Sequence, residues 1–276
     1  MEASRYVTCL RHDAARLREA ADGHLDLPVP TCPGWTVADL VRHVSRAYQH
    51  KVKCIQLGEF PKPWPPEPSG EDPIAEFDRS LAELLAEFDS HDPADFARTW
   101  YTPDQTVGFW IRRMALETVI HRVDAELAYR GVTAVPVDLA LDGVDEVLTI
   151  MLGWVVAEDV REHGPEIVPG GLADADSRPL EIRAGERTWS VVITPSGAEV
   201  STEPSTGTAS SGTAMGDASA ADGAARGADG AAATVTGDPV DLLLWLWRRG
   251  DDSRLTVDGD RALVDQLHRV MAAATQ

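Results

Sequence analysis

Residues 31–50 read TCPGWTVADLVRHVSRAYQH, and this stretch decides the interpretation of the fold. It opens with a Pro-Gly turn and continues with apolar residues at three- and four-residue spacing, as in an amphipathic helix. Thr36 is a suitable N-cap, followed three residues later by Asp39, and the pattern continues to about Leu57. His43 lies among the core-facing positions of this predicted helix. A single inward histidine is usually a hydrogen-bonded core residue, so His43 alone identifies no site.

The same spacing predicts more helices around this one. A helix starts at Asp72-Pro73, where an N-cap residue precedes a proline at the first helical position. Gly131 is expected to end the helix predicted over residues 104–130 as its C′ glycine. Four helices of this length joined by loops predict a four-helix bundle, and a fifth helix either closes this half or leads into the next. The expected helices besides 36–57 cover residues 4–21, 73–88, 104–130 and 138–162.

From residue 179 the pattern changes to short alternating segments divided by turns, which is typical of strands. A helix is predicted after Asp238-Pro239, followed by another strand and a final helix. Residues 204–231 contain mainly Ala, Gly, Ser, Thr and Asp, so we predict a disordered insertion there. The expected fold is therefore α+β, with a helical bundle over residues 1–162 and a small α+β domain over residues 175–276.

The composition excludes several classes of protein. The formal net charge is −20, and a surface of this sign repels nucleic-acid phosphates and anionic lipids. No stretch of about 18 apolar residues occurs, and the charged N-terminus lacks a signal region. The three cysteines form no C-x-x-C pair, which argues against a disulfide framework. We therefore expect a cytoplasmic protein that binds neither nucleic acid nor membrane.

One group of residues has the chemistry of a candidate metal site. Glu117 and His121 are four residues apart, so both leave the same face of their predicted helix. Such a pair alone usually lies on the surface, but His43 could meet it across the bundle and complete a three-ligand metal site with an open position. His50 is two helical turns from His43, too far to bind the same ion. Asp124 could replace Glu117 as the carboxylate ligand or hold a ligand histidine from behind.

The flanking residues resemble a known family. CPGWTVADLVRHV at residues 32–44 and ETVIHRVDAELA at residues 117–128 resemble the two recognisable motifs of the mycothiol-dependent maleylpyruvate isomerase family. That resemblance implies an N-terminal DinB-like four-helix bundle followed by a small α+β C-terminal domain. It also implies that His43, Glu117 and His121 hold zinc or another divalent metal.

The second half is similar to the C-terminal domain of the same family. The similar segments are WSVVITPSGAEV, ATVTGDPVDLLLWLWRRG and LTVDGD. The family usually has a glycine where this chain has Arg248, while the arginine that follows is kept as Arg249. The resemblance implies that Arg249 faces the active site as a catalytic residue. The alternative is that Arg249 complements the dipole at the end of its helix.

The resemblance implies a thiol-dependent enzyme of actinobacterial type, with mycothiol as cosubstrate and a small electrophile as substrate. A thiol bound to zinc is deprotonated, and the thiolate is the nucleophile. The reaction would be a cis–trans isomerisation or an S-transfer, which the metal site does not distinguish. A non-catalytic regulatory module and a metal-dependent hydrolase remain alternatives. The resemblance is compatible with a monomer.

Overall fold

A computed structural model of the chain describes residues 1–66, 70–204 and 230–275. Contacts divide the chain into two compact units, Met1–Leu139 and Ala140–Gln276. The insertion predicted at 204–231 lies almost wholly outside the described residues. Within the described ranges, no helix is both long and apolar enough to cross a membrane. The three cysteines are free thiols, as expected.

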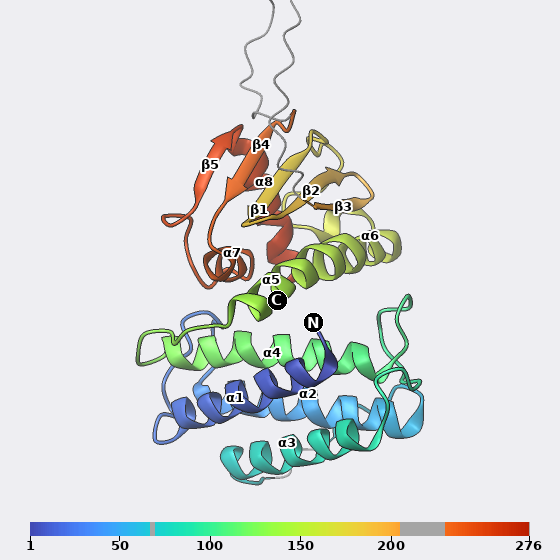
Figure 1. Cartoon of the computed structure of the whole chain (residues 1–276), viewed down its shortest axis with the longest axis vertical. Helices are drawn as coiled ribbons and strands as arrows, with labels where there is room; N and C mark the ends of the chain where they lie inside the picture. The colour runs from blue at the N-terminus through green and yellow to red at the C-terminus, as the bar shows by residue number, and fades with distance from the viewer. Residues whose placement is uncertain (67–69, 205–229, 276) are drawn as a thin grey trace, which may run out of the picture. The chain divides into compact units, whose positions relative to one another are not determined.

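The first unit is a bundle of four long helices, which lie side by side in Figure 1. Apolar residues of all four helices form its core, among them the fully buried Leu10, Leu40, Leu84 and Trp110. Helix α1 packs against α4, and α2 packs against both α3 and α4. This arrangement confirms the predicted four-helix bundle. Its helices are α1 (Ala3–Ala21), α2 (Val37–Leu57), α3 (Pro73–Ser90) and α4 (Val107–Leu127).

The ends of α2 are set by local signals in the sequence. The Thr36 side chain accepts a hydrogen bond from the backbone N–H of Asp39, and the Asp39 carboxylate accepts one from the backbone N–H of Thr36. This reciprocal pair is a capping box. At the other end, Gly58 has a φ of 67°, which suits a residue without a side chain. The helix is thus fixed at both ends, which sets the face that carries His43.

The end of α4 differs from the prediction. The helix stops at Leu127, and Gly131 does not have the positive φ of a C′ glycine. Instead, the buried Glu126 carboxylate accepts hydrogen bonds from the N–H of Thr133 at 2.8 Å and from Arg122 Nη1 at 2.9 Å. The predicted role of Gly131 was wrong because a charged side chain, and not backbone conformation, directs the chain out of this helix.

The second unit is a five-stranded sheet with helices, and the predicted strands are all present. Its strands are β1 (Leu180–Ala184), β2 (Arg187–Thr194), β3 (Gly197–Pro204), β4 (Ala233–Thr236) and β5 (Thr256–Gly259). Its helical segments are α5 (Val137–Glu146), the π-helical η1 (Val147–Val155), α6 (Val156–His163), the short η2 (Pro165–Ile167), α7 (Pro239–Leu246) and α8 (Arg261–Ala274).

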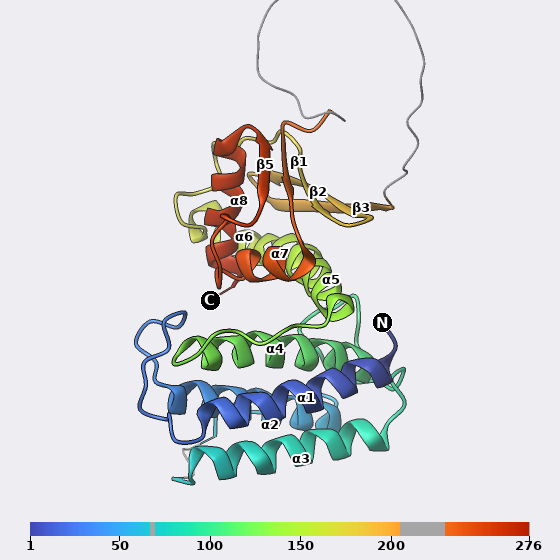
Figure 2. The same cartoon turned by 60° about the vertical axis from the view of Figure 1, so that its left-hand side comes forward.

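The fifth predicted helix is the continuous α5–η1–α6 segment, which belongs to this second unit from Ala140 onward. Segment η1 contacts β3 and α8, and α6 also contacts β3. Figure 2 shows α6 and α8 beside the strands. The division of the contacts between Leu139 and Ala140 therefore differs from the expected boundary at residue 162. The apolar side of this segment packs on the sheet, a partner that helical periodicity does not reveal.

The strands follow the order β3-β2-β1-β4-β5. Strands β1 and β4 are parallel, with Leu180 opposite Ala233, and the other neighbours are antiparallel. Alternate residues of β1 and β2 are buried, including Ile182 and Trp189. Because α8 contacts both β4 and η1, these helical segments cover the same face of the sheet.

Candidate metal centre

The first component of the site is His43, nearly two turns into α2. Its side chain is 41% exposed, so the histidine lies at the edge of the bundle core and not within it. The ring of Trp35, from the turn before the helix, lies 5.0 Å from the His43 ring between centroids. The Pro-Gly turn therefore places an aromatic wall beside this imidazole.

The other two components come from α4. Glu117 and His121 are one turn apart on the same face, and their side chains are only 15% and 12% exposed. Glu117 Oε1 lies 3.3 Å from His43 Nε2 and 3.2 Å from His121 Nε2. One ligand atom from each residue lies within 4.8 Å of the other two. The structure thus brings together the three predicted ligands, although their role as ligands stays a prediction.

Asp124 lies directly behind His121. Its Oδ2 is 3.0 Å from His121 Nδ1, and its side chain is fully buried. Thr31 Oγ1 donates a hydrogen bond to the other carboxylate oxygen at 2.6 Å, and the Cys32 thiol lies 3.7 Å from Oδ2. An acceptor at Nδ1 fixes the imidazole orientation and leaves Nε2 to face the centre. Asp124 therefore occupies the supporting position and not that of the carboxylate ligand.

The electrostatics of the centre favour an ionised carboxylate. Burial raises the pKa of Glu117, but the guanidinium of Arg113 and the imidazole of His121 outweigh burial and hold this pKa well below its usual value. Arg113 forms a hydrogen-bonded ion pair with Glu117 from the preceding turn of α4. Burial lowers the pKa of His121, but Glu117 and Asp124 outweigh it and raise the value to about 9. Without a bound cation, a proton on His121 and the charge of Arg113 together balance the two carboxylates.

This donor set fits a divalent metal ion. Two imidazole nitrogens and one carboxylate oxygen are typical zinc ligands, and three protein ligands leave a fourth position open. Ligand atoms of a tetrahedral zinc with bonds of about 2.0–2.1 Å lie about 3.3 Å from one another. The two distances from Glu117 Oε1, 3.3 and 3.2 Å, match that separation. A cation here would replace the proton on His121.

Two other candidates lie elsewhere. His50 is outside the group of converging ligand atoms, and its ring packs against Trp64 at 5.0 Å between centroids. Arg249 belongs to the second unit, where its Nη1 donates to the carbonyl of Trp247 at 2.6 Å, just after α7. That contact agrees with a role at the helix end, and the catalytic role of Arg249 stays a prediction. Arg248, in the usual glycine position, has a φ of 62°.

Two cationic groups near the site, Arg113 and Lys51, were not predicted from the sequence. The i,i+4 spacing of Arg113 and Glu117 could have revealed their pair. Lys51 offered no such signal. Its ammonium lies 5.0 Å from the centroid of the Trp110 ring, and burial lowers its pKa to about 8. Lys51 has this environment because Trp110 of α4 lies beside its ammonium group. The spacing of residues along α2 does not indicate that contact.

Comparison with known proteins now identifies the family. Residues 7–126 match the mycothiol maleylpyruvate isomerase N-terminal domain, and residues 138–266 match the MDMPI C-terminal domain. The chain belongs to the mycothiol-dependent maleylpyruvate isomerase family. The resemblance that the sequence motifs indicated is thereby confirmed. Among curated protein sequences, none matches this member of the family significantly.

Two solved structures share the family fold. A crystal structure of the mycothiol-dependent maleylpyruvate isomerase superposes with a TM-score of 0.57 at 14% sequence identity, covering 94% of this chain and 93% of that chain. A structure of a histidine-to-alanine mutant of that enzyme gives a TM-score of 0.56 with the same identity and coverage. The likeness extends over both units and confirms the predicted α+β fold class.

Proposed function

We propose that this protein is a mycothiol-dependent enzyme with a zinc ion held by His43, Glu117 and His121. The observation that carries the proposal is the convergence of their ligand atoms within 4.8 Å of one another. Membership of the maleylpyruvate isomerase family supports mycothiol as the cosubstrate. When bound, the zinc would supply a Lewis acid that lowers the pKa of a coordinated thiol.

The residues of the chain have separate tasks in this proposal. Arg113 keeps Glu117 ionised, and Asp124 holds the His121 ring in place through Nδ1. His43 is the most exposed of the three ligands, so the open side of the site lies next to this imidazole. Glu117 and His121 are nearly buried and provide the rigid part of the centre. The bundle thus presents a fixed set of donors with access from one side.

The proposed reaction is a cis–trans isomerisation of an unsaturated substrate. The thiolate of mycothiol adds to one carbon of the electrophilic double bond, and the electron pair moves onto the conjugated group. Rotation about the new single bond and expulsion of the thiolate give the isomer and return mycothiol unchanged. If the adduct is instead protonated and released, the product is an S-conjugate. The family to which the chain belongs favours isomerisation.

Two further assignments accompany this proposal. Arg249 would face the reacting groups as a catalytic residue, on the strength of its motif in the C-terminal domain. A lysine at this position would keep the charge but lose the planar fork of donors, so Arg249→Lys should lower turnover more than metal content. We also propose a cytoplasmic location, because the proposed thiol cosubstrate requires a reducing compartment.

Mass spectrometry tests the proposal directly. The purified chain is incubated with zinc, mycothiol and a panel of unsaturated electrophiles, and the products are identified as isomer, conjugate or neither. His121→Ala should lose both stoichiometric zinc and thiol binding. His12→Ala removes an exposed histidine of α1 and should behave as the parent protein. Mycothiol turnover that persists after removal of the metal would refute the mechanism.

The alternatives give distinct results in the same experiments. Hydrolysis of model esters without added thiol would identify a metal-dependent hydrolase. Stoichiometric zinc binding with no turnover of any electrophile would indicate a non-catalytic binding protein.

A further inference from the structure

A cavity of about 360 Å³ lies on the bundle beside the most exposed ligand of the metal centre. Its walls come from the Pro-Gly turn and from the first three turns of α2. The side chains from α2 lie on the same side of the helix because they are related by spacings of three or four residues. The lining residues are Gly34, Trp35, Asp39, Arg42, His43 and Arg46.

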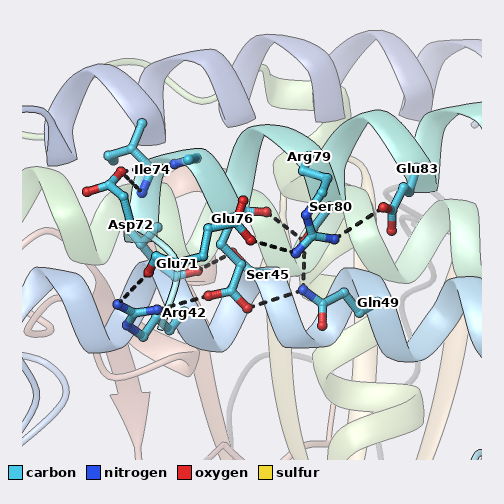
Figure 3. A network of polar contacts seen from close by, with 12 residues as sticks. Arg42, Ser45, Gln49, Glu71, Asp72, Ile74, Glu76, Arg79, Ser80 and Glu83 are labelled. Carbon is cyan, nitrogen blue, oxygen red and sulfur yellow. Dashed lines mark hydrogen bonds and ion pairs between the residues drawn. The ribbon is translucent and has the colours of Figure 1, made fainter. Parts of the chain in front are cut away.

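One of the two arginines of this cavity is held by the neighbouring helix. Arg42 Nη1 donates to Glu76 Oε2 at 2.9 Å, and Nη2 donates to the carbonyl of Glu71 at 2.9 Å. Figure 3 shows this network between α2 and α3, with Gln49 also donating to Glu76. The charge of Arg42 is thus balanced by a carboxylate, and its donors are directed toward α3.

The acidic residue of the cavity, Asp39, also has hydrogen-bond partners within the chain. Asp39 Oδ2 accepts hydrogen bonds from Thr36 N at 2.9 Å and from Thr36 Oγ1 at 2.7 Å, as part of the helix cap. Those bonds lower the pKa of Asp39, and the charges of Arg42 and Arg46 lower it further. Asp39 is therefore ionised and held at the helix N-terminus, within the field of both guanidinium groups.

Arg46 differs from Arg42 and Asp39 in its hydrogen bonding. It is half-buried, yet within the described parts of the chain its guanidinium donates no hydrogen bond and joins no ion pair. The charge of Asp39 interacts with that of Arg46, but no carboxylate of the described residues lies within ion-pair distance of this guanidinium. The ring of Trp35 forms an adjacent wall, next to the His43 imidazole. The cavity thus combines an aromatic surface with a guanidinium that makes no hydrogen bond to the described residues.

We propose that this cavity binds the carboxylate of a planar, conjugated substrate, with Arg46 as the residue that holds it. A guanidinium presents a fork of N–H donors that matches a carboxylate, and the Trp35 ring would contact the planar part of the substrate. This inference rests on the proposed function, because it makes the cavity the substrate-binding side of the same centre. Arg46 would then determine specificity for acidic over neutral electrophiles.

The experiment compares two probes of the same shape and different charge. Benzoate and neutral benzamide are titrated against the full-length protein, and their dissociation constants are measured by ligand-observed NMR. Arg46→Gln should weaken benzoate binding at least about tenfold, or about 1.4 kcal/mol, because the charge-assisted hydrogen bonds of the guanidinium are lost. Benzamide binding should not change. Lys53→Gln, which removes an exposed cation of the same helix, should leave both affinities unchanged.

Turnover and metal content separate this inference from the proposed function. Arg46→Gln should keep the zinc content of the parent and raise KM for a carboxylate electrophile, with little change for the corresponding amide. Equal benzoate affinity in Arg46→Gln and the parent, or no preference for benzoate over benzamide in the parent, would overturn the inference. Benzoate binding requires no turnover, so a failed zinc or thiol assay refutes the proposed function without affecting this result.

Discussion

The supporting role of Asp124 gives a prediction that depends on pH. Both of its carboxylate oxygens accept hydrogen bonds, one from His121 Nδ1 at 3.0 Å and one from Thr31 Oγ1 at 2.6 Å. In Asp124→Asn one oxygen becomes an NH₂ group, which cannot accept. The Thr31 hydroxyl can rotate to accept from this NH₂, so the remaining oxygen can still face His121. The substitution then removes the negative charge while keeping the geometry.

The magnitude follows from two opposing effects. Loss of such a supporting partner lowers metal affinity about 10–100-fold, or about 1.4–2.8 kcal/mol. The same charge helps to raise the pKa of His121 to about 9, and in the parent at about pH 7 a metal must displace that proton. Each pKa unit corresponds to about 1.4 kcal/mol, so a lower pKa in the variant partly offsets its loss at neutral pH. The full difference should appear only at about pH 9 and above.

Competition with a chromophoric chelator measures the zinc affinity of the parent and of Asp124→Asn at about pH 7 and about pH 9. Asp138→Asn is the matched control, because it removes one carboxylate that pairs with Arg5 at the surface and leaves the centre intact. Thermal unfolding of the metal-free proteins confirms that each variant is folded. Equal zinc affinities of parent and Asp124→Asn at about pH 9 would refute the supporting role of Asp124. A loss larger at pH 7 than at pH 9 would refute the proton competition.

Three further predictions concern stability and are measured by urea unfolding. Thr36→Ala removes the cap of α2 and should cost about 1 kcal/mol, whereas Thr36→Ser should cost little. Arg248→Gly should stabilise the protein by about 1 kcal/mol, because Arg248 has a φ of 62°; unchanged stability would contradict this. Lys51→Met should stabilise by about 1–3 kcal/mol at neutral pH, since burial lowers the pKa of Lys51 to about 8. The gain should decrease as the pH rises from 8 toward the unfolded pKa of about 10.4, and a gain independent of pH would contradict the cause.

Local signals in the sequence were sufficient for the elements of the fold. Caps such as Thr36 and the Asp72-Pro73 and Asp238-Pro239 pairs place the helix starts within a residue or two. The i,i+4 spacing places Glu117 and His121 on the same face of α4, and this result does not depend on how the other helices pack. The candidate site could be anticipated because its chemistry depends on those local spacings together with one histidine of α2, His43, which lies at the edge of the core.

The remaining features depend on contacts between distant segments. Cys32 and Thr31 meet Asp124 only because the turn before α2 packs against the end of α4. Arg42 and Arg46 are equivalent in sequence, one turn apart on α2. Only the position of Glu76 on α3 shows that Arg42 forms an ion pair, whereas Arg46 forms none with the residues that the structure describes. Strand order is non-local in the same way, because alternation of apolar residues does not indicate which strands become neighbours.

The parallel pairing of β1 with β4 has a consequence for how the second unit folds. Strands β1, β2 and β3 are joined by short turns and can pair through local contacts, whereas β4 must return past two strands to reach β1. This pairing closes the longest loop in the sheet, and loop-closure entropy must be overcome before its contacts form. Each doubling of the length between β3 and β4 costs only about 0.6 kcal/mol. The length of that connection should therefore be reflected in the folding rate much more than in the stability of the finished sheet.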